Sequence, residues 1–527
     1  MKKSIFGLLF IMLGQFLLAC TLVSAFYYFT EGEDDWQALL TPALGSILLG
    51  FWLKYLGRDD KDDRLTRTDS FLIVSLCWIL FSAIGMVPYL LYWPSGMNVA
   101  DAYFETMSGF TTTGSTVMEN IDDMPHGLLL WRSMTQWIGG LGIVVVGFAL
   151  LPFMEFKNSN VFQAETTGLS LDKLRPRIGD TARRLLVIYF LITMVCALLL
   201  WMGPMNMFDA INHAMTTIAT GGFSTHQASI GYYHSPYVEY VCSFFMLVAS
   251  INFSLYYYLS IRKSKIFLRN EEMQTFLLIV LFAVAVFTLV FHYGHIACPD
   301  PTVTPHSNEN IFRTALFHVS TIISSTGFQG QYFDYMRWGD TFWVFTIIIM
   351  VIGACAGSTG GGAKVIRLLV YCKWFVRDFV LQIHPRAVVN VKINNQVIPE
   401  SIVHRVLGFL VTYFLLVIIG VGVFSFMGYD MHTSMGTFVT ALSNIGPGTG
   451  DFGPANTFAS LNDFGKWMLS FYMLVGRLEI FTIFVIFMPS FWAQKRVENG
   501  FTSHACHSIS NIFGFVGRGF RKKGSKK

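Results

Sequence analysis

The chain has 527 residues, of which 53% are hydrophobic and 13% are charged, and its formal net charge is +4. Soluble domains carry about 25% charged residues, so 37 basic and 33 acidic side chains are too few to cover a soluble protein of this length. Much of the surface must therefore face lipid, which excludes an ordinary soluble protein. The small net charge also gives no indication of nucleic-acid binding.

Ten apolar stretches have the length needed to cross a membrane, about 20 residues for roughly 30 Å of hydrocarbon. We therefore predict an all-α polytopic membrane protein with ten transmembrane helices. The first stretch follows Lys2 and Lys3 and has no clear cleavage site, so we interpret it as a retained helix and not as a signal peptide. The predicted spans cover residues 4–29, 36–56, 70–93, 128–153, 185–202, 237–259, 275–293, 342–363, 404–427 and 464–488.

Lys and Arg are distributed unequally between the two sides of these spans. With the N-terminus in the cytoplasm, the inner segments hold 32 of the 37 basic residues, as the positive-inside rule requires. Ten spans then place both termini in the cytoplasm, and the lipid bilayer surrounds the chain. The outer segments hold 18 acidic residues and four basic ones, which we expect to form a negative entrance that concentrates cations.

After the first two spans, the other eight form four pairs, and a segment too short to cross the membrane lies within each pair. The first two of these segments place an Asp 13 residues before a Gly, and the third and fourth keep a Phe at an offset matching that of the first. Their residues are Asp101–Gly114, Asp209–Gly222, Thr314–Gly327 with Phe317, and Met435–Gly448 with Phe438. We therefore predict four repeats, each made of two spans with a short segment between them, behind an N-terminal helix pair.

Each segment has about ten residues able to form a half-helix, followed by a stretch rich in Thr, Ser and Gly. Non-helical backbone at membrane depth needs protein or a water-filled path to satisfy its polar groups. Four half-helix C-termini around one axis favour a cation, and Gly-centred backbone can turn carbonyl oxygens toward it. Extracellular turns are the alternative, but fourfold repetition favours an ion-selectivity filter. The predicted filter residues are Thr112, Thr113, Gly114, Thr220, Gly221, Gly222, Ser325, Thr326, Gly327, Gly446, Pro447 and Gly448.

Two features inside the predicted spans also need an explanation. Residues 353–362 contain five Gly, three of them consecutive, and each costs a helix about 1 kcal/mol. The alternative interpretation of these Gly residues is a helix whose small side chains allow close packing against a neighbouring helix. Arg477 is the only basic residue at mid-span, where a charge must face protein or water. We interpret it as an electrostatic barrier beside the path and a hydrogen-bond donor to carbonyls of the Gly-rich stretch; a structural ion pair, for instance with Glu479, is the alternative.

These residues resemble the Trk/Ktr/HKT superfamily of potassium transporters, and the resemblance implies a fold of four pseudo-fourfold membrane-pore-membrane repeats in one chain. The resemblance covers essentially the whole chain, including the N-terminal helix pair, and is carried by the four Gly-centred segments, the stretch Gly353 to Lys364 and Gly-Arg477-Leu-Glu479-Ile-Phe-Thr. It implies bacterial uptake of potassium, the transported ion, with no organic cofactor on this chain. In this family Gly at all four filter positions goes with a preference for potassium.

The resemblance also implies a gate and partners. The Gly-rich stretch would be an intramembrane loop that blocks the path when closed. The implied gate residues are Gly353, Gly357, Ser358, Thr359, Gly360, Gly361, Gly362, Lys364 and Arg477. The protein would be a homodimer with one pore per protomer. By the same resemblance, a cytosolic, nucleotide-binding, TrkA-like regulatory subunit would dock on inner loops such as 154–184 and 364–403. This chain has no Walker A motif of its own.

Other classes of function remain open at this level. A membrane enzyme is disfavoured because the His residues are scattered and no nucleophile with a base is apparent. A potassium symporter coupled to protons or sodium remains an alternative to a channel. The expected domains are the helix pair 1–68, pore repeats 69–153, 154–259, 260–375 and 376–490, and a basic cytoplasmic tail 491–527.

Overall fold

A computed structural model of the protein describes residues 3–58, 67–92, 96–150, 178–293, 307–332 and 334–492. Within these ranges the chain is mostly helical, and its strands form one antiparallel hairpin of β1 (Lys392–Ile393) and β2 (Gln396–Val397). Most of the predicted docking loop 154–184 and nearly all of the tail 491–527 lie outside the described residues.

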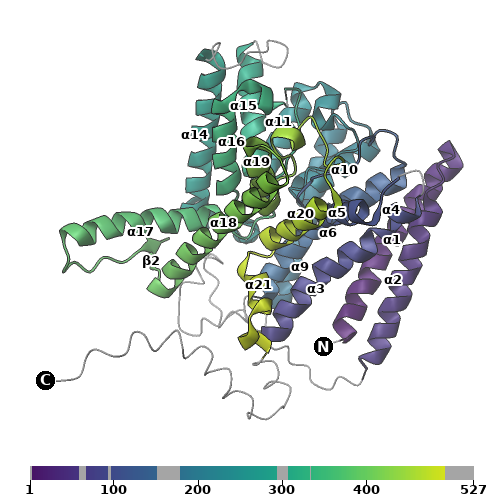
Figure 1. Ribbon diagram of the computed structural model, residues 1–527, viewed down its shortest axis with the longest axis horizontal. Coiled ribbons are helices and arrows are strands. Elements are labelled where there is room, and N and C mark those ends of the chain that lie inside the picture. The colour runs from purple at the N-terminus through teal and green to yellow at the C-terminus, as the bar shows by residue number, and fades with distance from the viewer. Residues whose placement is uncertain are drawn as a thin grey trace.

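The first two helices, α1 (Lys3–Glu31) and α2 (Trp36–Leu56), lie side by side at one edge of the molecule (Figure 1). The turn between them attaches to the rest of the protein through Asp35. Its carboxylate accepts hydrogen bonds from the Ser24 hydroxyl and from the Leu128 backbone N–H, the latter at 3.1 Å. Asp35 therefore joins the predicted N-terminal helix pair to α6 (His126–Leu150), the helix that contains Leu128.

In the remaining chain, a short helix lies between longer helices four times in succession. The four short helices are α5 (Val99–Phe110), α10 (Met207–Ile218), α15 (Asn308–Ile323) and α19 (Met431–Ser443). The helices before them are α3 (Arg67–Gly85) with α4 (Val87–Leu91), α9 (Ile178–Trp201), α14 (Glu271–Tyr293) and α18 (Glu400–Phe426). Those after them are α6 (His126–Leu150), α11 (Pro236–Ser250) with α12 (Phe253–Ser260) and α13 (Ser264–Leu268), α16 (Asp340–Ile352) with α17 (Val365–Ile383), and α20 (Asp463–Arg477) with α21 (Phe481–Phe484).

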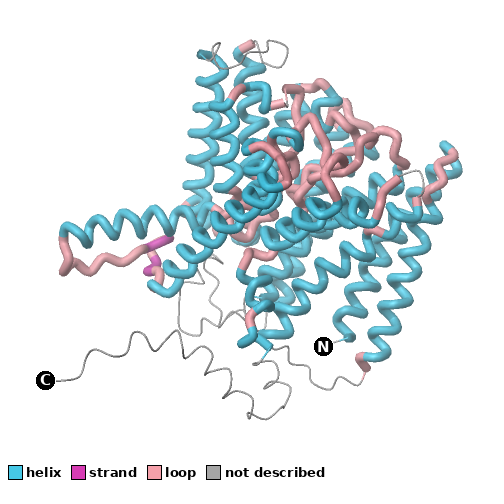
Figure 2. Tube along the Cα trace, viewed as in Figure 1, coloured by secondary structure: helices cyan, strands magenta, loops and turns pink. Residues whose placement is uncertain are grey.

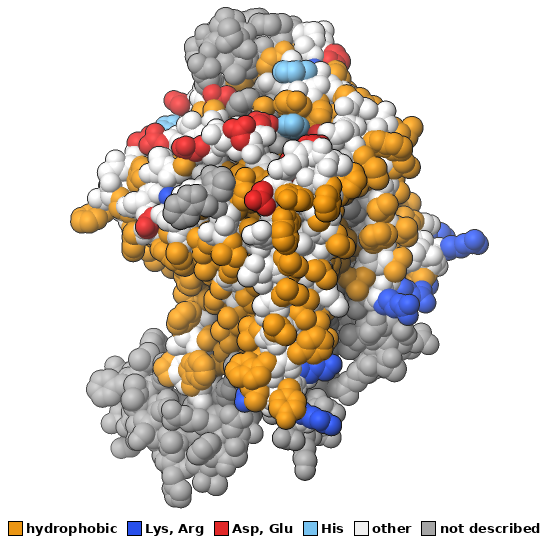
Figure 3. Space-filling view, turned by 90° about the vertical axis from the view of Figure 1, so that its right-hand side faces the viewer, with side chains coloured by type: hydrophobic (Ala, Val, Ile, Leu, Met, Phe, Trp, Pro, Cys, Tyr) orange, Lys and Arg blue, Asp and Glu red, His pale blue; other side chains and the backbone are white. Residues whose placement is uncertain are grey.

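The surface has the polarity of a membrane protein. Among the residues that the structure describes, six helices are long and apolar enough to cross a bilayer, or eight if each of two bent pairs counts as one span. On the face in Figure 3, a broad hydrophobic region separates acidic side chains near the top from Lys and Arg side chains lower down. Figure 2 shows the loops gathered mainly at the upper end of the helical body.

Three predicted spans are not continuous helices. The chain bends by 91° between α11 and α12, and by 106° between α20 and the segment Phe481–Phe487. The predicted span 342–363 is wrong as a helix, because α16 ends at Ile352 and Gly353 adopts a φ of +70°. At the first bend, the Asn252 side chain caps α12, and the Phe253 N–H donates to the Gly357 carbonyl oxygen.

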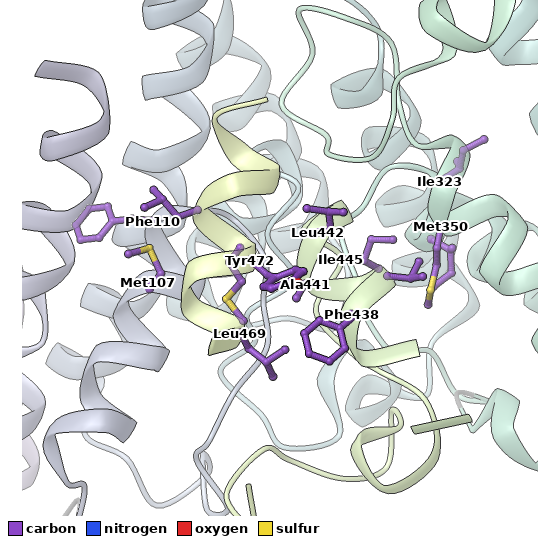
Figure 4. Close-up of a cluster of buried hydrophobic side chains, with 14 of the residues drawn as sticks. Met107, Phe110, Ile323, Met350, Phe438, Ala441, Leu442, Ile445, Leu469 and Tyr472 are labelled. Atoms are coloured by element: carbon purple, nitrogen blue, oxygen red, sulfur yellow. The ribbon is translucent and has the colours of Figure 1, made fainter. Parts of the chain in front are cut away.

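The four short helices begin with a polar cap and end in the protein interior. The caps are Asn98, Asn206, Ser307 and Asp430, whose side-chain oxygens accept a backbone N–H in the first turn. Their C-terminal halves are buried, and Figure 4 shows apolar side chains of α5, α15 and α19 around this level. At 12 to 16 residues these helices are too short to cross the hydrocarbon.

Candidate functional site

The segment after each short helix has the same backbone pattern. Two residues with positive φ follow each helix, separated by one residue. The pairs are Thr112 (+52°) and Gly114 (+91°), Thr220 (+54°) and Gly222 (+78°), Ser325 (+60°) and Gly327 (+81°), and Asn444 (+55°) and Gly446 (+104°). Residues other than Gly rarely adopt this conformation, so its fourfold occurrence marks four equivalent extended loop segments. We call residues 112–114, 220–222, 325–327 and 444–446 filter strands 1 to 4, after the role predicted for them from the sequence; they are not β-strands.

The four Gly residues of these pairs form a closed ring. A Cβ added to Gly114 would lie 2.1 Å from the Gly221 carbonyl oxygen, and one added to Gly222 would lie 1.9 Å from that of Thr326. A Cβ on Gly327 would meet the Ile445 carbonyl oxygen at 1.8 Å. The last contact closes the circle, because a Cβ on Gly446 would lie 2.9 Å from the Thr113 carbonyl oxygen. Each filter strand thus packs its Gly against the carbonyl that precedes the next Gly.

Filter strand 4 differs from the register expected from the sequence. Gly446, and not Gly448, has the positive φ and occupies the ring. Gly448 lies two residues later, and its N–H donates to the Phe452 carbonyl oxygen at 2.9 Å. The offset arises because α19 ends at Ser443, so Asn444 takes the first left-handed position. Pro447 lies next to the ring and lines the cavity above it.

A cavity of about 340 Å³ lies on one side of the ring, and all four ring Gly residues line it. Its wall includes Asp122 and His226. Of the outer acidic residues near filter strand 1, Asp122 reaches this cavity, whereas Glu119 and Asp123 line a second cavity of about 430 Å³. Glu105 is 1% exposed, so it is part of the protein interior and not of the entrance.

Buried ion pairs fix the backbone around the filter strands. Arg132 of α6 pairs with Glu105 of α5 at 2.7 Å and donates to the Ser224 carbonyl oxygen at 2.8 Å. The same Glu105 carboxylate accepts the Val117 N–H at 2.9 Å. In the neighbouring part of the protein, Arg313 and Glu239 form a second buried pair at 2.7 Å. Lys466 of α20 also pairs with Asp101 at 2.5 Å, so three of the four basic residues predicted on the outer side are neutralised locally.

His226 connects two repeats at the cavity wall. Its ring contacts Asp122 at 2.8 Å and Asp209 at 3.3 Å, and it stacks on Tyr232. Partial burial lowers the pKa of the imidazole, but the hydrogen bonds and charges of Asp209 and Asp122 outweigh it and leave the pKa raised. Cationic His226 is thus stabilised between two carboxylates.

Three side chains that sequence reasoning missed hold the filter strands in position. Ser115 donates to the Gly446 carbonyl oxygen at 2.7 Å. The Asn444 amide donates to the Thr113 hydroxyl and to the Met473 carbonyl oxygen, both at 2.9 Å. Gln136 of α6 donates to the Gly221 carbonyl oxygen at 2.6 Å. A lone Gln or Asn in an apolar stretch was the available signal, since a buried amide needs partners.

The Gly-rich stretch forms a non-helical loop between α16 and α17, residues 353–364, directly against the filter strands. The Gly361 N–H donates to the Ser325 hydroxyl at 2.5 Å. A Cβ on the same Gly361 would lie 1.9 Å from the Ser443 carbonyl oxygen at the end of α19. The Thr359 hydroxyl donates to the Ile218 carbonyl oxygen at the end of α10, at 3.0 Å. This loop therefore contacts three of the four repeats.

The loop is itself held in an unusual shape. Gly353, Gly357 and Gly362 have φ values of +70°, +69° and +80°, and the Ser358 hydroxyl donates to the Cys355 carbonyl oxygen at 2.6 Å. Lys364 has a φ of +75° and donates through Nζ to the Gly360 carbonyl oxygen. A small-residue helix face, the alternative considered above, does not describe this segment.

Arg477 joins the loop to two other repeats. Its Nη1 donates to the Thr359 carbonyl oxygen at 2.6 Å, and its Nη2 donates to the Gly139 carbonyl oxygen of α6 at 3.1 Å. This is the contact with the Gly-rich stretch that the sequence predicted. Glu479 does not pair with Arg477: φ is positive at Glu479, and its carboxylate contacts Arg367 at 2.6 Å instead.

Comparison with known proteins identifies the family. The family model of TrkH, a cation transport protein, matches residues 43–494. The chain is 38% identical to the Trk system potassium uptake protein TrkH of Salmonella typhimurium and 37% identical to that of Escherichia coli, over 93% of this chain and 98% of each relative. The crystal structure of the potassium transporter TrkH from Vibrio parahaemolyticus superposes with a TM-score of 0.81 at 32% identity, covering 93% of this chain and 99% of that one. The fold, the length and the sequence agree, and the chain belongs to the TrkH family of membrane cation transport proteins.

Proposed function

We propose that this protein takes up potassium across the bacterial cytoplasmic membrane through a single path, with the four filter strands as its selectivity filter. The ring of Gly114, Gly222, Gly327 and Gly446 carries the proposal, because it gathers four backbone carbonyl oxygens from four repeats. Carbonyl oxygens can replace the hydration shell of a cation. The names of the relatives, potassium uptake proteins, support potassium as the ion.

The partial charges around the ring support a cation. Four helices end at the filter strands, and a helix C-terminus carries about half a negative charge. Asp122 adds a carboxylate to the cavity wall. Asp122 is paired there with His226, so the negative potential at the ring comes chiefly from the helix C-termini and the backbone carbonyl oxygens.

We assign the gate to the loop 353–364 together with Arg477. The loop packs against the filter strands at Ser325, and Arg477 places a guanidinium against it. A cation approaching this point would meet a positive charge in a region of low dielectric, which opposes its passage. Opening then requires the loop to leave Ser325 and Arg477 to release Thr359. A homodimer and a nucleotide-binding regulatory subunit of the TrkA type are the proposed partners, and both termini are proposed to be cytoplasmic.

The test is cation flux into liposomes that contain the purified protein, comparing potassium, rubidium, sodium and lithium. We expect potassium and rubidium to enter faster than sodium and lithium. Equal rates for all four cations would contradict the selective filter. Flux that requires a proton or sodium gradient would assign the protein to symport instead of channel conduction.

A further inference from the structure

The four repeats place different side chains behind the filter strands. In the second, third and fourth repeats, the helix after the filter strand (α11, α16 or α20) carries a buried Met three positions before a small residue. In the first repeat the same position holds Gln. The four pairs are Gln136 and Gly139, Met246 and Ala249, Met350 and Gly353, and Met473 and Gly476.

The backbone contacts support this alignment between the first and fourth repeats. A Cβ on Gly139 would lie 2.1 Å from the Phe110 carbonyl oxygen, and a Cβ on Gly476 would lie 2.1 Å from that of Leu442. Phe110 and Leu442 each lie two residues before the first positive-φ residue of their filter strand. Gln136 and Met473, three positions earlier, are therefore equivalent in space as well as in sequence.

Gln136 makes two hydrogen bonds that a Met cannot make. Its Nε2 donates to the Gly221 carbonyl oxygen at 2.6 Å, and its Oε1 accepts the Phe223 N–H at 3.1 Å. The two bonds bracket Gly222, the ring residue of filter strand 2. Gln136 is 0% exposed, so these bonds form without competition from water.

The four ring carbonyls are consequently not equivalent. Gly221 supplies the carbonyl that packs against Gly114, and it already accepts a hydrogen bond from Gln136. In the described part of the chain, no donor reaches the corresponding carbonyl oxygens of Thr113, Thr326 and Ile445. An amide donor fixes the position of a carbonyl and lowers its strength as a ligand.

We propose that Gln136 is a positioning residue that sets cation selectivity by fixing filter strand 2. This proposal rests on the proposed function of the ring as a filter. With Gln136 in place, the Gly221 carbonyl and the Phe223 N–H have fixed partners, so the ring resists contraction around an ion smaller than potassium. Without Gln136, filter strand 2 can move inward and coordinate a smaller ion such as sodium.

The test is the ratio of potassium to sodium flux in liposomes. Gln136→Met gives the first repeat the side chain of the other three and removes both bonds. Gln136→Glu keeps an acceptor for the Phe223 N–H and replaces the donor to Gly221 with an oxygen. Loss of one hydrogen bond is worth about 1 kcal/mol, so we expect both variants to lower the potassium-to-sodium ratio roughly three- to tenfold while potassium flux persists.

Gln274→Met is the matched control, since Gln274 is exposed on α14 and donates to the Leu268 carbonyl oxygen far along the chain from the filter strands. It should leave the ratio unchanged. An unchanged ratio in folded Gln136→Met, or in Gln136→Glu if the Met variant does not fold, would overturn the proposal. A loss of potassium flux and sodium flux in equal proportion would also overturn it, because it would indicate that Gln136 has a purely structural role. If the unsubstituted protein itself does not discriminate between the ions, the proposed filter fails first.

Discussion

The Nη1 atom of Arg477 lies 2.6 Å from the carbonyl oxygen of Thr359, so the last residue of α20 is bonded directly to the Gly-rich loop. Both residues are buried, at 4% and 0% exposure. A hydrogen bond from a charged donor to a neutral acceptor in such a place contributes about 1.5–3 kcal/mol. This bond therefore favours the arrangement in which the loop rests against filter strand 3.

Arg477→Gln removes the charge and weakens this bond. We expect potassium flux into liposomes to rise by roughly tenfold, because about 1.4 kcal/mol less then favours the closed arrangement. Arg269→Gln makes the same chemical change at an exposed position before α14 and should leave the flux unaltered. Reduced or equal flux in correctly folded Arg477→Gln would count against the gate.

Substitution of a ring Gly should relax selectivity. In Gly222→Ser the new Cβ would lie 1.9 Å from the Thr326 carbonyl oxygen at a φ of +78°, and an L-residue in this conformation costs about 1–2 kcal/mol. The strand must shift, so the potassium-to-sodium flux ratio should fall roughly tenfold.

The two Gly residues of filter strand 4 test the register. Gly446→Ser places a side chain in the ring, whereas Gly448→Ser adds one outside it, where the nearest atom is the Phe452 carbonyl oxygen of the same loop. We expect the flux ratio to fall in Gly446→Ser and to stay near the unsubstituted value in Gly448→Ser. The opposite order would assign the ring position to Gly448.

The pair of Arg132 and Glu105 should be important for stability. Arg132→Met leaves the Glu105 carboxylate buried without its guanidinium partner, which typically costs about 3–5 kcal/mol. Thermal unfolding in detergent should show a clear loss in this variant. The double substitution Arg132→Met with Glu105→Gln removes the unpaired charge and should recover part of the loss; no recovery would mean that the charge is not the cause.

His226 should make the stability depend on pH. Its pKa is raised in the folded protein above the ordinary value of 6.5, and the facing groups are Asp122, Asp209, Tyr232 and Tyr233. The stabilisation is therefore complete below pH 6.5 and is lost as the pH rises through the folded pKa. The difference in unfolding temperature between the unsubstituted protein and His226→Gln should therefore decrease as the pH rises from 6.5 through the folded pKa of His226. A difference independent of pH would contradict this assignment.

The filter strands were readable from the sequence because the chain repeats them. Gly114, Gly222 and Gly327 follow matched segments at one spacing, and the structure places all three in the ring. In the fourth segment the same spacing selects Gly448, whereas Asn444 ends α19 in a left-handed conformation and brings Gly446 into the ring. A count of residues cannot detect where a helix stops.

Other parts of the site depend on contacts between distant segments. The apolar stretches of the sequence continue on both sides of Asn252 and Glu479, so we did not expect the helices to break after α11 and α20. Asn252 is nevertheless a good helix cap. The bonds of Gln136 to filter strand 2 join residues 85 positions apart. A lone Gln in an apolar stretch indicates that the amide needs partners, but the pattern within one segment does not identify them.

The contact of Gly446 with the Thr113 carbonyl closes the ring between the last filter strand and the first. A ribosome makes filter strand 4 after the loop 353–364, so the segment that packs under the ring already exists when the fourth strand arrives. A growing chain therefore has three filter strands and the loop 353–364 before it has a complete ring. Arg477, which donates to the loop at Thr359, is made later still, so both the ring and the support of the loop depend on the last repeat.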